Sequence, residues 1–294
     1  MIDLHMHSSF SNDGEFSPLA LLDKCLAQGI TTLSITDHNC VRANQVEQIA
    51  KEKGLTYVTG IEIDCVWHGV NFHVLGYHIN YLSSDFEEIE QNIRSQGLKV
   101  SLEMLEKTQA LGLHVTENEL WDLAKDTYWS ETWTGEMFAE ILLEKEEYKD
   151  HPLLLPYRAG QARGNNPYVN FYWDYYAQGK PLYVPISYPP MNQIIDLIHQ
   201  NNGYAVLAHP GVNLNGKESL LEEIVSLGMD GIEAFSSYHT PTKAYQYYNE
   251  AKRCHLFTTC GSDFHGKTKP SIVLGGHGSL LRKDELIEQI KFLS

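Results

Sequence analysis

The 294-residue sequence lacks the features that would assign it to several common protein classes. It has no run of about eighteen apolar residues, so no membrane span is expected. The N-terminus carries no basic and then apolar leader, which favours a cytoplasmic location. The five cysteines are scattered and form no Cys-x-x-Cys pair. This spacing argues against a disulfide framework or a zinc ribbon and predicts a reducing compartment.

Positive charge is also scarce. The chain has 22 lysines and arginines but 38 aspartates and glutamates, which gives a net charge of −16. An acidic surface repels long polyanions, so neither duplex nucleic acid nor a membrane is an expected partner. A metal cluster can reverse the field at one site, so a small phosphorylated substrate is compatible with this charge. Hydrophobic residues make up 43% of the chain, which predicts a buried core.

The first fourteen residues contain the most informative pattern, His5-x-His7 followed by Asp13 in a polar loop. On a β-strand, residues i and i+2 point to the same face, so both imidazoles project to one side. Two imidazoles at this spacing can bind one metal ion, and histidine is the commonest metal ligand. For the motif taken alone, two buried and hydrogen-bonded histidines are the alternative interpretation.

Most of the remaining chain alternates strand and helix patterns. Predicted strands cover 31–36, 55–63, 204–208, 231–235, 256–259 and 271–274, and a predicted hairpin covers 60–79. Predicted helices cover 17–28, 41–53, 191–201, 217–227, 241–253 and 283–293. This order predicts an α/β fold, with a parallel sheet or barrel and helices outside it.

Residues 83–180 interrupt this alternation. Helical patterns cover 84–111, broken only by Gly97, and also 117–125 and 133–147, and an aromatic run follows at 168–176. We interpret this region as a mainly helical insertion, and residues 1–82 and 181–294 as the main domain. The aromatic run is more typical of packing than of substrate stacking.

Candidate metal ligands recur at the ends of the predicted strands. They are His5, His7, His38, Glu62, His209, Asp263 and His265, with His73 on the hairpin. Active sites of barrels and open α/β sheets assemble at the carboxyl ends of their strands. Histidines and carboxylates without thiolates suit Mn²⁺, Fe²⁺ or Zn²⁺, and the size of the set implies two or three divalent ions. A charged Glu62 between two isoleucines also requires a cation to offset its desolvation.

Six short motifs occur along the chain: Asp3-Leu-His5-Met-His7, Thr36-Asp37-His38, Gly60-Ile-Glu62, Phe72-His73-Val-Leu-Gly, Ala208-His209-Pro210 and Gly261-Ser-Asp263-Phe-His265-Gly266. In this order they resemble the PHP (polymerase and histidinol phosphatase) family, and they span nearly the whole chain. The resemblance is greatest to phosphoesterases of nucleoside 3′,5′-bisphosphates and of oligoribonucleotide 5′ ends.

The resemblance implies a distorted (β/α)7 TIM-like barrel with a three-metal site. It implies one ion on His5, His7, Glu62 and Asp263, a second on Glu62, His73 and His209, and a third on Asp13, His38 and His265. Asp3 and Asp37 resemble side chains that orient imidazoles.

Asp13 and His239 are expected to take part in catalysis. Asp13 lies one residue further from His7 than in the family pattern, because Asn12 is additional. A bulged loop would still let Asp13 reach the third ion. His239 matches a family position that faces the substrate, and either His239 or a metal-bound water is expected to be the general acid.

The insertion departs from the family pattern at the position of a phosphate-gripping arginine. Here the chain has Thr134-Gly135-Glu136, and a charged Glu136 would repel a phosphate. Arg158, Arg163 or Lys180, which are cationic and near Gly-rich loops, is therefore expected to bind the substrate phosphate instead. Solvated surface charge is the alternative interpretation of Arg158 and Arg163.

The hypothesis from the sequence is a metal-dependent phosphoesterase for nucleotides or short oligonucleotides. The ions would polarise the phosphoryl oxygens, and a metal-bound hydroxide would attack phosphorus in line. A histidinol-phosphate-type phosphatase and a non-catalytic metal-binding module are the alternatives. An amidohydrolase-type metallohydrolase is disfavoured, because no bridging lysine lies on a predicted mid-chain strand.

Overall fold

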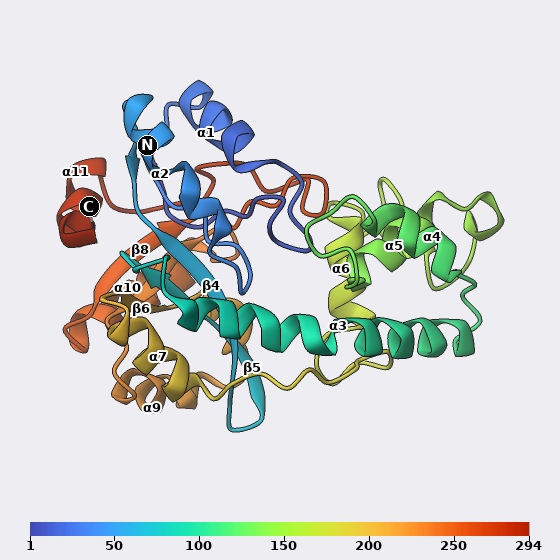
Figure 1. Cartoon of the computed structure of the whole chain (residues 1–294). Helices are drawn as coiled ribbons and strands as arrows, with labels where there is room; N and C mark the ends of the chain where they lie inside the picture. The colour runs from blue at the N-terminus through green and yellow to red at the C-terminus, as the bar shows by residue number, and fades with distance from the viewer. Residues whose placement is uncertain (294) are drawn as a thin grey trace.

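The computed structural model describes residues 1–293, and its strands form two sheets (Figure 1). The first is a parallel sheet of β1 (Ile2–Asp3), β2 (Thr32–Leu33) and β3 (Thr56–Tyr57). The second contains, in spatial order, β4 (Gly60–Trp67), β5 (Val70–Tyr77), β6 (Tyr204–Leu207), β7 (Gly231–Ser236) and β8 (Phe257–Gly261). Strands β4, β5 and β6 pair antiparallel, whereas β6, β7 and β8 pair parallel.

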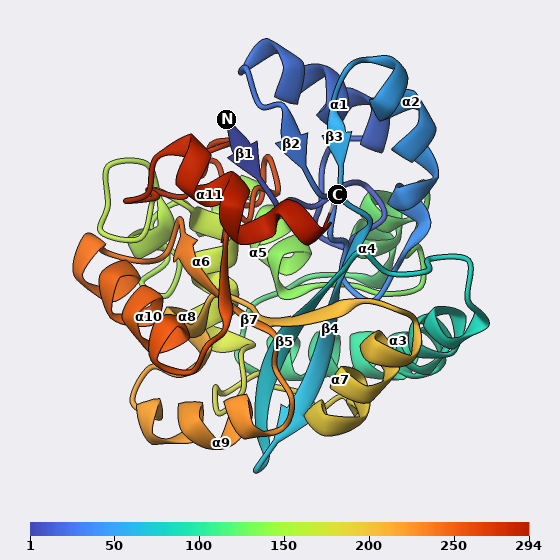
Figure 2. The same cartoon turned by 90° about the vertical axis from the view of Figure 1, so that its left-hand side faces the viewer.

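Helices cover the sheets and form a separate group beside them. The α-helices are α1 (Pro18–Ala27), α2 (Glu47–Glu52), α3 (Ser84–Ala110), α4 (Glu117–Ala124), α5 (Gly135–Glu144), α6 (Pro167–Tyr175), α7 (Met191–Gln200), α8 (Pro210–Asn213), α9 (Leu221–Ser226), α10 (Pro241–Arg253) and α11 (Lys283–Ile290). Helix α7 packs against β4, β5 and β6, and α10 packs against β7 and β8 (Figure 2). Helix α3 extends from the sheets to α4, α5 and α6, which lie together on one side (Figure 1).

Local sequence signals account for the helix boundaries. Ser17 caps α1 by accepting a hydrogen bond from the Ala20 amide, and Gly29 follows the helix with φ of 72°. Helix α3 continues through Gly97 without a break. Glycine is required at this position, because a Cβ atom there would overlap the Thr132 side chain. The predicted helix over 84–111 is therefore one unbroken element.

Two strand predictions were wrong. The predicted strand over 55–63 is divided between β3 and β4, so Glu62 lies near the start of a strand and not at its carboxyl end. Residues 271–274 form no strand, although Ile272 and Leu274 are buried alternately. Their backbone makes turn hydrogen bonds instead, including one from the Ile272 amide to the Lys269 carbonyl at 3.0 Å.

The mixed α/β fold class is confirmed, whereas a closed barrel sheet does not form within residues 1–293. Isolated backbone bridges connect the two sheets. Met6 pairs with Phe264 at one junction, and His38 pairs with Glu62 at the other. Both junctions lie beside candidate metal ligands.

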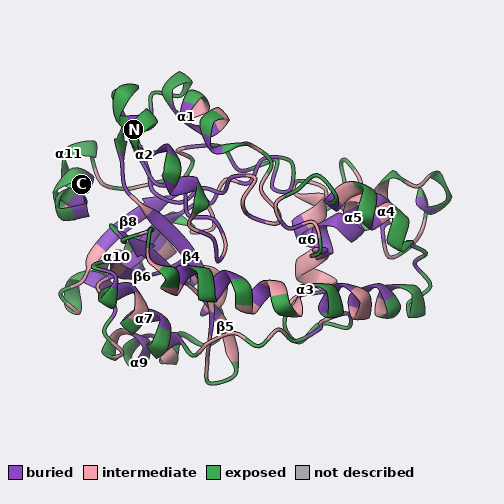
Figure 3. Ribbon diagram, viewed as in Figure 1, coloured by how far each residue is buried: buried purple, intermediate pink, exposed green. Residues whose placement is uncertain are grey.

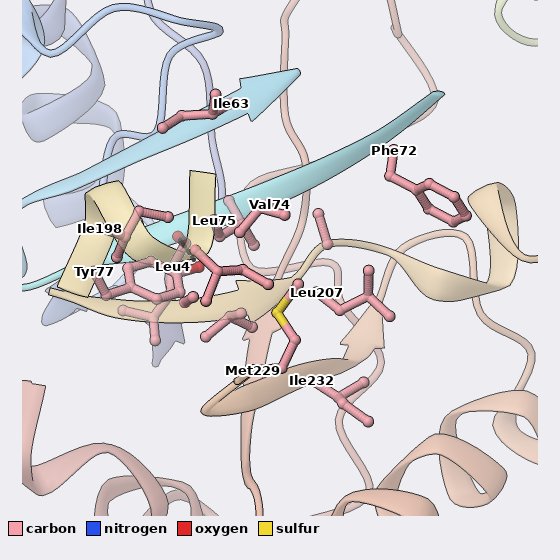
Figure 4. Packing of buried hydrophobic residues seen from close by; sticks show 14 of the residues in the cluster. Leu4, Ile63, Phe72, Val74, Leu75, Tyr77, Ile198, Leu207, Met229 and Ile232 are labelled. Atoms are coloured by element: carbon pink, nitrogen blue, oxygen red, sulfur yellow. Dashed lines mark hydrogen bonds between the residues drawn. The ribbon is translucent and has the colours of Figure 1, made fainter. Parts of the chain in front are cut away.

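The largest hydrophobic cluster lies around the five-stranded sheet, where the ribbon is mostly buried (Figure 3). Figure 4 shows Val74, Leu75 and Tyr77 of β5 packed with Leu4 and Leu207 in this cluster. A second cluster lies within the predicted insertion and includes residues from α3, α4, α5 and α6.

All five cysteines are free. Across residues 1–293, no helix is both long enough and apolar enough to cross a membrane.

Replacing Tyr77 with phenylalanine should destabilise the fold. The Tyr77 hydroxyl donates a hydrogen bond to the Leu4 carbonyl at 2.9 Å, and both residues are fully buried. Removing the hydroxyl leaves this carbonyl without a donor, which costs ~1–3 kcal/mol. Urea unfolding of Tyr77→Phe measures the loss, with Tyr245→Phe as the exposed control. Equal unfolding free energies for the two variants would contradict the expectation.

Candidate metal centre

The structure brings the nine candidate ligands into one cluster where β1, β2, β6 and β8 end and β4 begins. Three groups have one donor atom per residue within 4.8 Å of each other: His5, His7, Glu62 and Asp263; His38, Glu62 and His73; and His7, Asp13, His38 and His265. The first group has the composition expected for the first ion. His209 joins the second group through its Nε2 atom, which lies 3.3 Å from Nδ1 of His73.

The four donor atoms of the first group are evenly spaced. Nε2 of His5 lies 3.1 Å from Nε2 of His7. Each of these nitrogens lies 3.0–3.2 Å from an oxygen of Glu62 and an oxygen of Asp263. Ligands at 2.0–2.2 Å from a tetrahedral ion are separated by roughly 3.3–3.6 Å, so this spacing is close to that of a single metal site.

Glu62 divides its two oxygens between different imidazoles. Oε1 lies 2.9 Å from Nδ1 of His73 and 2.9 Å from Nε2 of His209. Oε2 faces the two histidines of the first motif and Nδ1 of His38, which is 3.3 Å away. A carboxylate in this arrangement can bridge two ions.

Asp13 reaches the cluster despite the additional residue before it. Its Oδ2 atom lies 3.1 Å from Nε2 of His265. The intervening loop is tight, and a Cβ atom at Gly14 would overlap the Ser8 carbonyl. Glycine at that position therefore lets the loop absorb Asn12 and return Asp13 to the site.

Three ligand atoms are buried without a hydrogen-bond partner: Oδ1 of Asp13, Nδ1 of His38 and Oδ1 of Asp263. Such atoms are rare inside proteins and require an explanation. Each belongs to a residue of the cluster and lies among other potential ligand atoms. The residues present therefore fit bound divalent cations.

The charges of the cluster stabilise each other. Burial alone would raise the pKa of Glu62, but His5, His73 and His38 hold that pKa well below its usual value. Burial also opposes protonation of His73, yet Glu62 and Asp64 raise its pKa to about 10. Desolvation disfavours isolated charges in such a site, so its carboxylates stay ionised only beside cations.

Surrounding carboxylates orient the imidazoles, and the sequence interpretation missed two of them. Glu233 is fully buried on β7 and contacts Nδ1 of His5 at 2.9 Å. Its other oxygen accepts a hydrogen bond from the His209 amide. Asp64 lies 3.0 Å from Nε2 of His73. Glu233 could have been identified from the sequence, because it is a charged residue within the otherwise apolar predicted strand 231–235.

The two aspartates expected to orient imidazoles act differently from each other. Asp37 accepts a hydrogen bond from the Ser11 hydroxyl, which contacts Nδ1 of His7 at 2.9 Å. Asp3 instead accepts hydrogen bonds from the amide and hydroxyl of Ser262, and so ties β1 to the segment after β8.

Lys269 was not identified from the sequence, and it is the one buried lysine or arginine among residues 1–293. Its Nζ atom lies 2.8 Å from Oδ2 of Asp263 and 3.4 Å from Nε2 of His265. The Tyr238 hydroxyl donates to the same Asp263 oxygen at 2.6 Å. Lys269 and Tyr238 thus hold Oδ2 and leave Oδ1 of Asp263 facing the histidines.

The cations expected to bind a substrate phosphate are used elsewhere or exposed. Arg158 donates to the carbonyls of Leu143 and Tyr148 within the insertion. Arg163 forms two hydrogen bonds with the Asp174 carboxylate, each 3.0 Å long. Lys180 is exposed. The structure does not bring these three side chains to the cluster, because local partners satisfy the arginines.

His239 has both ring nitrogens engaged with the backbone. Nδ1 lies 2.8 Å from the Ala234 carbonyl and so carries the proton, and Nε2 accepts a hydrogen bond from the Gly211 amide at 2.9 Å. Burial lowers its pKa, which favours this neutral form. No proton faces a substrate, so the arrangement does not support the expected catalytic role. His239 instead holds the segment after His209.

The predicted insertion contacts the loops that carry the ligands. Trp129 donates its indole N–H to the Phe10 carbonyl in the loop before Asp13. Lys267, which follows His265 by two residues, forms an ion pair with Glu140 of α5 at 2.7 Å.

Comparisons with known proteins agree with this geometry. The PHP domain family matches residues 3–158. The 5′-3′ exoribonuclease Rnm of Escherichia coli (strain K12) is 30% identical over 282 residues, which cover 93% of this chain and 87% of that protein. The 3′,5′-nucleoside bisphosphate phosphatase of Chromobacterium violaceum is 25% identical over 268 residues, which cover 90% of this chain and 87% of that protein.

A solved structure shows the same fold. It is an amidohydrolase from Chromobacterium violaceum with bound sulfate and no metal, with a TM-score of 0.76 and 24% identity. The match covers 98% of this chain and 96% of that chain.

Glu136 should make the stability of the metal-free protein depend on pH. Burial and then the charge of Asp13 raise its pKa to about 7, while Lys269 opposes them. The folded state therefore favours the neutral acid, and stability is lost as the pH rises from about 4.5 through about 7. Glu136→Gln removes this loss, so it should stabilise the chelator-treated protein by roughly 3 kcal/mol at pH 8 and by roughly 1 kcal/mol at pH 5.5.

Thermal unfolding at both pH values measures this difference, with exposed Glu131→Gln as the control. An equal gain at pH 5.5 and pH 8 would show that the Glu136 charge is not the cause.

Proposed function

Because the chain belongs to the PHP domain family, we propose that it is a metal-dependent phosphoesterase that hydrolyses phosphate esters of nucleotides or short oligonucleotides. The observation that carries the proposal is the convergence of nine histidine and carboxylate side chains, three of them with buried and unpartnered donor atoms. The names of the relatives supply the substrate class.

The proposed ligands are distributed around Glu62. His5, His7 and Asp263 would hold one divalent ion with its Oε2 atom, and His73 and His209 would hold another with Oε1. Asp13, His38 and His265 would hold a third. Bound ions of this kind lower the pKa of a water molecule and polarise phosphoryl oxygens.

The chain itself positions the groups around the reacting phosphate. Glu233 and Asp64 fix the ring orientations of His5 and His73, which keeps their other nitrogens directed at Glu62. Lys269 adds a permanent positive charge beside Asp263, where a phosphate oxygen could also be neutralised. We propose Lys269, in place of Arg158, Arg163 and Lys180, as the cation that faces the phosphate.

Two further features concern the architecture of the protein and its location in the cell. The bridges between the two sheets are consistent with a distorted barrel, with residues 83–180 as an insertion that covers the site. Five free cysteines suit a reducing compartment, and we infer a cytoplasmic location.

Asp263→Asn should remove most phosphoesterase activity and lower the metal content while the fold is retained. The amide preserves the volume of the side chain but not the charge that attracts the ion. Elemental analysis, circular dichroism and hydrolysis of nucleoside monophosphates measure the three properties, and Asp23→Asn on the exposed face of α1 is the control. A variant with wild-type turnover and metal content would refute the assignment of Asp263.

Replacing Lys269 with methionine should lower kcat/KM for nucleoside monophosphates by about tenfold or more, since hydrogen bonds to charged groups contribute ~1.5–3 kcal/mol. Lys180→Ala should leave kcat/KM unchanged, because this lysine is exposed. Metal content separates two routes: a parallel loss of ions indicates action through Asp263, and full occupancy indicates action on the phosphate. The proposal for Lys269 fails if kcat/KM is retained.

A further inference from the structure

A cavity of about 390 Å³ lies between α6 and the loops that follow β7 and β8. It is lined by Asn170 and Trp173 of α6, by Ser237 and Tyr238 after β7, and by Val273 after β8. Its volume is within the range of small-molecule sites. The amide of Ser271 donates a hydrogen bond to the Asn166 side chain at 2.8 Å and so joins two of its walls.

The cavity adjoins the metal centre through a single side chain. Tyr238 lines the cavity, and its hydroxyl donates to Oδ2 of Asp263 at 2.6 Å. Lys269 lies on the same tyrosine, with Nζ 5.5 Å from the ring centroid. Neither Asp263 nor Lys269 lines the cavity itself, so a molecule held there would contact Tyr238, whose hydroxyl bonds to Asp263.

The lining of the cavity is polar but uncharged. Among the described residues that form it, none is an aspartate, glutamate, lysine, arginine or histidine. It therefore offers no charge to a phosphate. Trp173 offers an aromatic surface and Asn165 its amide nitrogen, whereas the Asn170 amide nitrogen already donates to the Arg163 carbonyl and to Asn165 Oδ1. The Ser237 hydroxyl is buried behind this lining and has no hydrogen-bond partner, so turning it toward a ligand by rotation about the Cα–Cβ bond breaks no hydrogen bond.

The aromatic run that contains Trp173 has two roles in the structure. Phe171 and Tyr176 belong to the buried cluster of the insertion, as expected for packing residues. Trp173 is half-buried and lies outside that cluster, on the cavity wall. A half-exposed indole beside amide groups is typical of a surface on which a planar heterocycle stacks.

We propose that this cavity binds the nucleobase of the substrate while the phosphate lies at the metal centre. The inference rests on the proposed function and deepens it, because it assigns the specificity for nucleotides to Trp173 and Ser237. A neutral heterocycle matches the uncharged lining, and its ring nitrogens and exocyclic groups can bond to the amides and the Ser237 hydroxyl.

The first test compares substrates with and without a base. For the metal-loaded wild type, kcat/KM should be higher for adenosine and uridine 5′-monophosphates than for ribose 5-phosphate. Trp173→Ala should lower the values for the nucleotides about tenfold, the size of one lost base–aromatic stack, and leave ribose 5-phosphate unchanged. Trp121→Ala, an exposed tryptophan on α4, is the matched control.

Ser237→Ala is a second test of the inference, which still applies if the Trp173→Ala variant does not fold. The Ser237 hydroxyl makes no hydrogen bond within the protein, so its removal should leave thermal stability unchanged. It should weaken the preference for nucleotides over ribose 5-phosphate. If wild type, Trp173→Ala and Ser237→Ala all have the same ratio of the two kcat/KM values, the cavity does not bind the base.

A binding measurement separates this inference from the proposed function. Calorimetric titration of the chelator-treated protein with adenosine and with uridine needs no catalysis. Binding that Trp173→Ala weakens would support the cavity, even if the metal-loaded protein hydrolysed no phosphate ester. Absence of binding for both nucleosides, together with equal hydrolysis of nucleotides and ribose 5-phosphate, would overturn the inference while the phosphoesterase assignment stands.

Discussion

The buried carboxylate of Glu62 is the constraint on which the site and the junction of the sheets both depend. It is fully buried, and its oxygens face five imidazoles, those of His5, His7, His38, His73 and His209. A charge in such a position is stable only where cations surround it. The backbone of Glu62 also accepts a hydrogen bond from Asn39 and donates one to Asp37, which connects the two sheets. Side chain and backbone of one residue thus link metal binding to the fold.

The pairing of β4 with β5 determines which histidines the Glu62 side chain contacts. Glu62 and Asp64 are two residues apart on β4 and share a face, and His73 on β5 pairs with Asp64. His73 therefore contacts both carboxylates at once. A shift of the register by one residue would turn these side chains to the opposite face, so the ligand set requires this pairing. The turn at His68 and Gly69 supports the register, because both residues adopt positive φ.

The sequence predicted the parts of the structure that depend on short spacings. The His5-x-His7 motif, the hairpin and most helix positions follow from local patterns. Most candidate ligands lie where strands begin or end, whereas His73 lies within β5 and Asp13 in a loop. Residues whose roles depend on tertiary contacts were missed. Glu233 contacts His5 across 228 residues of sequence, and Lys269 contacts Asp263 from a loop six residues further on, where no motif marks it. Arg158 and Arg163 were expected at the substrate because they are cationic and near Gly-rich loops, whereas in the structure carbonyls and Asp174 within the insertion accept their hydrogen bonds.

The distribution of charge explains how an acidic protein can accept an anionic substrate. With a net charge of −16, the surface as a whole repels phosphate, so attraction must be local. The insertion contributes little of it, because carboxylates pair with Arg94 and Arg163, and the carbonyls of Leu143 and Tyr148 hold Arg158 away from the cluster. The favourable charge would come mainly from the ions that the histidines and carboxylates are suited to hold, and Lys269 adds to it although Asp263 is its ion-pair partner. The uncharged cavity beside Tyr238 would add contacts with the substrate without repelling its phosphate. Since Tyr238 borders the cavity and bonds to Asp263, a ligand that fitted both regions would be aligned by the same residue that orients a candidate metal ligand.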